Sequence, residues 1–127
     1  MALDTVRPNV IRVHWSGQLT IEDLDLIRDY TSELRAEIGD DTPIFAFIEL
    51  GEGLGIPKSV RKALMNLGRE QPFCRTAVVG APFQAKVMLE LIFNAIRLLV
   101  KDAAETRFVD TVDEALDWLD HEQALAS

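Results

Sequence analysis

The glycine-rich segment Gly51-Glu52-Gly53-Leu54-Gly55 lies between an apolar run and a helix-like pattern that begins near Pro57. Backbone N–H groups in such a loop, together with the N-terminus of the following helix, can bind a phosphate. The spacing fits neither G-x-G-x-x-G nor G-x-x-x-x-G-K-S/T, and the carboxylate of Glu52 would repel a phosphate. We therefore interpret residues 51–55 as a flexible connection rather than a nucleotide site.

Side chains that bind metals or act as nucleophiles are sparse. His14 and His121 have no second ligand at the spacing of H-E-x-x-H or H-x-x-E-H, so no metal site is predicted. Cys74 has only Arg75 as a neighbouring cation, which favours a quiet, partly buried thiol over a reactive thiolate. Because no nucleophile can be combined with a base or a metal set, we expect neither an enzyme nor a cofactor.

The elements that carry these residues alternate between strands and helices. A strand is predicted over residues 10–15, paired with residues 3–6 across a turn, and buried strands over 44–50 and 76–80. A short last strand is predicted over 107–109. Helices are expected between these strands and after the last one, and Thr20 and Thr111 begin two of them as N-caps. This order predicts one α/β domain, residues 1–127, with right-handed crossovers.

The helix predicted over 58–69 carries a row of cations. Residues 51–100 hold 7 basic and 3 acidic side chains, whereas residues 1–50 hold 4 and 10 and residues 101–127 hold 2 and 8. Such asymmetry can focus an electrostatic field on one face, although a solvated helix face is the plainer alternative. The outward cations, which we expect to meet an acidic partner, are Lys58, Arg61, Lys62 and Arg69.

The helix predicted over 83–100 is more apolar than a single buried stripe requires. Its surplus must be covered by another part of this chain such as a terminal segment, by a second copy, by an apolar ligand or by a membrane surface. Its charges exclude a membrane span. The residues that we expect at an apolar-ligand or dimer surface are Met88, Leu91, Ile92, Phe93 and Ile96.

Composition excludes several classes of protein. With 127 residues, 48% of them hydrophobic, the chain can bury a real core, so intrinsic disorder is not expected. A net charge of −8 disfavours binding to nucleic acid, which requires clustered cations. The single cysteine and an N-terminus without the pattern of a signal peptide favour a cytoplasmic protein.

The order of features resembles the STAS domain, in particular its SpoIIAA-like branch, which is sometimes grouped with the lipid-binding Sec14 fold. The resemblance implies an α/β fold with a four- to five-stranded mixed sheet, an N-terminal hairpin and about four helices, in a cytoplasmic bacterial module without catalysis. The matching segments are Ser16-Gly17-Gln18-Leu19-Thr20, residues 44–50, Ala77-Val78-Val79-Gly80, Arg107-Phe108-Val109-Asp110 and residues 114–119.

In STAS relatives that antagonise anti-sigma factors, a partner kinase phosphorylates a serine in the loop after the central strand. That loop and the next helix bind the partner. The corresponding residues 49–55 contain no Ser or Thr. The resemblance therefore implies a signalling module for protein interaction without this switch, whose partner surface would combine the loop with the basic helix. Other SpoIIAA-like proteins resemble binders of apolar ligands or membrane surfaces, and this alternative would use helix 83–100.

Overall fold

A five-stranded mixed sheet organises the protein, of which the computed structural model describes residues 1–70, 73–99 and 105–126, with side chains up to residue 120. Strand order follows the sequence; β1 pairs antiparallel with β2, and all other pairs are parallel. The described residues confirm the predicted α/β fold with an N-terminal hairpin. The elements are β1 (Ala2–Arg7), β2 (Val10–Trp15), α1 (Ile21–Ile38), β3 (Phe45–Leu50), α2 (Lys58–Glu70), β4 (Arg75–Val79), α3 (Phe83–Leu99), β5 (Glu105–Val109) and α4 (Val112–Ala126).

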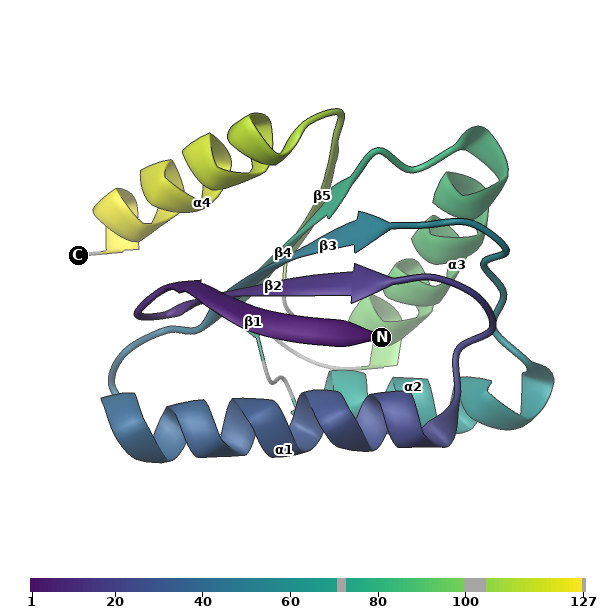
Figure 1. Ribbon diagram of the computed structural model, residues 1–127, viewed down its shortest axis with the longest axis horizontal. Coiled ribbons are helices and arrows are strands. Elements are labelled where there is room, and N and C mark those ends of the chain that lie inside the picture. The colour runs from purple at the N-terminus through teal and green to yellow at the C-terminus, as the bar shows by residue number, and fades with distance from the viewer. Residues whose placement is uncertain (71–72, 100–104, 127) are drawn as a thin grey trace.

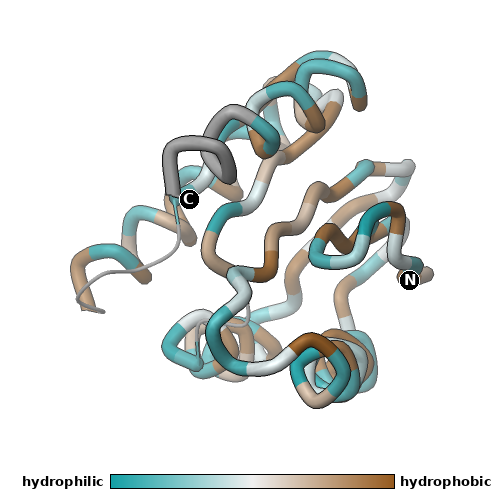
Figure 2. The backbone as a smooth tube through the Cα atoms, turned by 90° about the vertical axis from the view of Figure 1, so that its left-hand side faces the viewer, coloured by the Kyte–Doolittle hydropathy of each residue, from teal (hydrophilic) through white to brown (hydrophobic). Residues whose placement is uncertain are grey.

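Helices cover both faces of the sheet (Figure 1). Helices α1, α2 and α3, which connect the parallel strands, pack on one face, and α4 packs on the other. Figure 2 shows α1 and α2 side by side beneath the sheet. We expected that a terminal segment could cover α3. The C-terminal helix α4 does not do so, because α4 lies across the opposite face of the sheet.

Each face of the sheet has its own core. On the α4 face, Phe45 and Phe47 pack with Trp118 and Leu119, and the guanidinium of Arg107 lies 5.1 Å from the centre of the Trp118 ring. The larger core lies on the other face, where the alternation predicted for β2 directs every second side chain toward α1, α2 and α3. Strand residues one position apart therefore belong to different cores.

The ends of the strands differ slightly from the prediction. Strand β5 begins at Glu105 rather than at residue 107, because it pairs with β4 from Arg75 onward and the Arg75 guanidinium forms an ion pair with Glu105. Cys74 is exposed rather than partly buried. It lies just before β4, where its neighbour Phe73 fills the core position instead.

The N-terminus of α1 is closed by the capping box expected at Thr20. The Thr20 hydroxyl accepts a hydrogen bond from the Asp23 N–H at 3.1 Å, and the Asp23 carboxylate accepts one from the Thr20 N–H at 3.0 Å. At α4, the Thr111 hydroxyl accepts from the Glu114 N–H at 3.2 Å, as its T-x-x-E sequence predicts. These side chains satisfy N–H groups that a helix leaves unpaired at its start.

Replacing Thr20 by alanine should lower the free energy of unfolding by about 1 kcal/mol, the usual cost of losing an N-cap. Urea denaturation measures this change. Ser32→Ala, at an exposed position inside the same helix, is the matched control and should leave stability equal or slightly raised. Equal stability of Thr20→Ala and the wild type would show that this cap does not stabilise α1.

Candidate functional site

A cavity of about 140 Å³ lies between the sheet and helices α1, α2 and α3. Protein cores are close-packed, so a partly enclosed apolar space of this size is a notable feature of a domain of 127 residues. An apolar cavity of about 150 Å³ stays dry and accommodates a molecule such as benzene. The cavity is therefore large enough for one small apolar molecule or for one end of a longer one.

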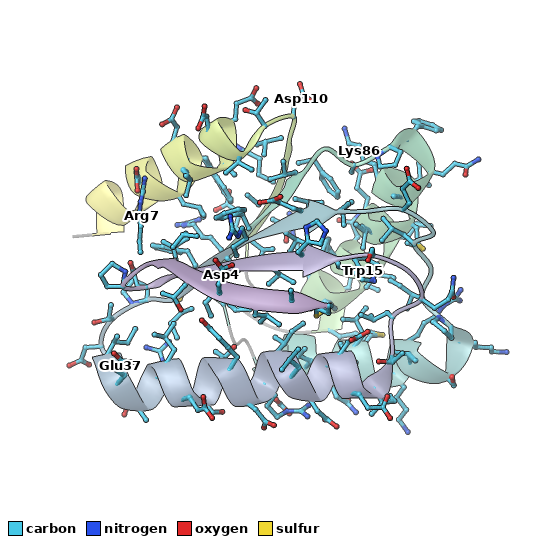
Figure 3. All side chains as sticks on the ribbon, viewed as in Figure 1. Asp4, Arg7, Trp15, Glu37, Lys86 and Asp110 are labelled. Carbon is cyan, nitrogen blue, oxygen red and sulfur yellow. The ribbon has the colours of Figure 1, made fainter. Side chains whose placement is uncertain are left out.

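Every parallel strand of the sheet contributes to the cavity wall. Side chains alternate along a strand, so every second residue of β2 to β5 faces this side. Trp15, labelled in Figure 3, lies at the C-terminal end of β2 and is 4% exposed. The strand residues that line the cavity are Val13, Trp15, Ile48, Thr76 and Thr106.

The opposite wall is built from three helices. Gly68 lets α2 approach α3 closely, since a Cβ there would lie 2.8 Å from Cδ1 of Ile96. Leu64 on α2 and Ile92 on α3 are half-buried, so the helical wall does not shield the cavity completely from solvent. The helical residues of the wall are Leu24, Ile27, Leu64, Leu67, Gly68, Leu89, Ile92, Phe93 and Ile96.

Three polar groups interrupt this apolar lining. Thr76 is 6% exposed, and Thr106 lies directly opposite it on β5. Neither hydroxyl has a hydrogen-bond partner in the described part of the chain. The indole Nε1 of Trp15 is fully buried and has no hydrogen-bond partner among the described residues. Buried polar groups are nearly always paired in proteins, so the Trp15 indole in particular requires an explanation.

Charged side chains stay outside the cavity. The Arg12 guanidinium donates to Asp4 at 2.9 and 2.6 Å, and this hydrogen bonding, reinforced by the negative charge of Asp4, raises the pKa of Arg12. Arg28 joins α1 to α2 through a 2.8 Å hydrogen bond to Glu70, which raises the pKa of Arg28. None of the described residues that line the cavity carries a charged side chain.

The structure places the predicted apolar residues of α3 on different sides of the helix. Ile92, Phe93 and Ile96 line the cavity, and Met88 is half-buried against the same core. Leu91 does not line the cavity: it is 67% exposed on the outer side of the helix. Other exposed apolar residues of α3 are Phe83, Val87, Leu98 and Leu99.

Loop 51–55 is fixed rather than free, unlike the flexible connection expected from its glycines. The Gly17 N–H donates to the Glu52 carbonyl at 2.8 Å, and the Gly51 N–H donates to the Trp15 carbonyl at 2.7 Å. A Cβ at Gly51 would lie 2.7 Å from Cβ of Ser16, so this approach requires glycine. Glu52 and Gly53 are exposed, whereas Leu54 packs against the core.

The four predicted cations of α2 are all exposed, and none forms an ion pair with a described residue. Lys58, Arg61 and Lys62 lie in the first two turns, close in sequence to loop 51–55. Arg69 lies 11 residues after Lys58, about 16 Å along the helix at 1.5 Å per residue. The structure therefore groups three of the cations near the loop and leaves the fourth at the far end.

Sequence reasoning missed the polar residues of the cavity. Thr76 begins the run 76–80, for which the sequence predicts only a buried strand, and Thr106 precedes the predicted last strand over 107–109. The available signal was a threonine at an inward-facing position of each strand. Valine has nearly the same shape without the hydroxyl, so a threonine there places a polar group where packing alone does not require one. No group of three or more metal-binding side chains occurs among the described residues.

The fold and its cavity define a small mixed α/β domain of the STAS type. A family profile described as SpoIIAA-like matches residues 10–120, and the chain belongs to this family. A crystal structure of an uncharacterised protein with a SpoIIAA-like fold, from Shewanella loihica PV-4, is similar with a TM-score of 0.55. The two chains are 20% identical over 93% of this chain and 90% of the other, a likeness that shows the fold.

No curated protein matches this sequence. Among the described residues, no helix has both the length and the apolar composition that crossing a membrane requires.

Proposed function

We propose that this SpoIIAA-like domain is a non-enzymatic binder of a small apolar molecule, which occupies the cavity between the sheet and helices α1, α2 and α3. The 140 Å³ apolar cavity is the observation that carries this proposal. Side chains that line a cavity lack packing partners on that side. A ligand that fills it restores the missing contacts, which gives binding a physical driving force.

Toluene is a suitable first probe, because it is neutral, apolar and only slightly larger than benzene. Isothermal titration should show one site per chain, and the melting temperature should rise with toluene concentration because the ligand binds only the folded state. A melting temperature that does not rise, together with no heat of binding, would contradict the proposal.

A second candidate function is docking of an acidic protein partner on loop 51–53 and the start of α2. The observation that favours it is a group of exposed cations that form no ion pair with any described residue, on a chain whose net charge is −8. Opposite charges across an interface mainly raise the rate of association. This face lies outside the cavity, so the two functions do not exclude each other.

Reversing two of these charges, in Arg61→Glu/Lys62→Glu, should slow association with an acidic partner captured from native cells about 10-fold or more at low salt. Surface plasmon resonance measures the rate. The control Lys86→Glu/Arg97→Glu makes the same change in charge on α3 and should leave association much less affected. Equal rates for the wild type and the α2 variant would exclude this face.

A further inference from the structure

We propose that the ligand of the cavity is an uncharged molecule with one hydroxyl or carbonyl group, which hydrogen-bonds to Thr76 and Thr106. This inference rests on the proposed binding of an apolar molecule and adds the chemistry that would select it. It concerns the part of the cavity wall formed by β4 and β5.

The sheet places the two threonines as neighbours. They are directly paired in the parallel register of β4 and β5, so their side chains point to the same face on strands about 4.8 Å apart. Both line the cavity. A single oxygen of a bound molecule can reach two hydroxyls at this separation, and hydroxyls can both donate and accept.

The hydroxyl of Thr76 lacks an internal role. Thr76 is 6% exposed, and its hydroxyl has no hydrogen-bond partner among the described residues. The other strongly buried threonine, Thr31, behaves differently, because its hydroxyl donates to the Ile27 carbonyl at 2.6 Å. An unpaired hydroxyl on a residue that lines a cavity is a natural contact for a polar group of a ligand.

The residues that line the cavity determine which charge a ligand can carry. Among the described residues, no lysine, arginine or histidine side chain lines the cavity, and the amino group of Met1, which does line it, already lies 3.9 Å from the Asp23 carboxylate. Moving an ion from water into an apolar site without a counter-charge is strongly unfavourable. A neutral alcohol, aldehyde, ketone or ester satisfies the threonines without this penalty, whereas a fatty-acid anion does not.

Three ring compounds of similar size test the inference: toluene without a polar group, benzyl alcohol with a neutral hydroxyl, and benzoate with a charge. We expect the affinity ratio of benzyl alcohol to toluene to fall about 5-fold in Thr76→Val, since one hydrogen bond is lost while the shape is kept. Thr106→Val, at a half-buried position, should act in the same direction and serves if Thr76→Val does not fold. Benzoate should not bind detectably.

The control Thr31→Val removes a buried hydroxyl outside the cavity and should leave the affinity ratio unchanged. If toluene binds but the ratio is the same in the wild type, Thr76→Val and Thr106→Val, the selection by threonine is wrong while the proposed function stands. Tight binding of benzoate would also overturn the inference. If toluene itself does not bind, the proposed function fails and the inference fails with it.

Discussion

Leu64→Trp is expected to abolish the binding of toluene while the protein stays folded. Leu64 lines the cavity from α2 and is half-buried, so a larger side chain there can turn into the empty volume. Filling a void restores packing contacts, whereas enlarging a side chain in a closed core usually costs about 1–3 kcal/mol. The melting temperature should therefore remain close to that of the wild type, and the heat of toluene binding should disappear.

The matched control is Leu91→Trp, which makes the same substitution on the exposed side of α3. This variant should bind toluene with the affinity of the wild type. Wild-type affinity in Leu64→Trp, or an equal loss in both variants, would show that toluene does not occupy the cavity.

Phe47→Ala is expected to destabilise the fold by about 3–5 kcal/mol, the range measured for deletion of a buried aromatic ring. Phe47 is 1% exposed and packs between the sheet and α4, on the face opposite the cavity. Because small domains are stable by only about 5–15 kcal/mol, this loss should remove a large part of the free energy of unfolding. Urea denaturation followed by circular dichroism measures the loss.

Phe83→Ala is the comparison for this variant, since Phe83 is 81% exposed at the start of α3. It should change stability by less than about 0.5 kcal/mol, as is usual for surface substitutions. A loss at Phe47 as small as that at Phe83 would mean that α4 does not pack on the sheet as described.

Local patterns predicted most of the fold. The alternation over residues 10–15 and the apolar run over 44–50 indicated strands because side-chain direction has a period of two and a doubly covered strand is apolar throughout. The capping box at Thr20 predicted the start of α1, because it depends only on Thr20 and Asp23, which are three residues apart. What the pattern left open was the position of α4, since its packing on the opposite face depends on contacts far apart in sequence.

The cavity could not be predicted in the same way. Its volume is the difference between the space that three helices and the sheet enclose and the volume of their side chains, so no single segment encodes it. The surplus apolarity of α3 did point to Ile92, Phe93 and Ile96, which line the cavity. Leu91 was grouped with them but is exposed, because adjacent residues on a helix point about 100° apart.

The two proposed sites use different sides of α2. Leu64 and Leu67 of this helix line the cavity, whereas Arg61 and Lys62 are exposed. A ligand in the cavity and a protein on the outer face could therefore contact the same helix. The tests with Leu64→Trp and with Arg61→Glu/Lys62→Glu separate the two contacts, because each changes only one side.

Methyl nuclear magnetic resonance during a toluene titration tests the central claim most directly. Five of the nine isoleucines line the cavity, namely Ile27, Ile48, Ile56, Ile92 and Ile96. Ring currents from bound toluene should shift the δ1 methyl signals of these five, whereas the signals of Ile11, Ile21, Ile38 and Ile44 should move much less. Shifts spread equally over all nine methyl groups, or no saturable shift at all, would contradict a ligand site in this cavity.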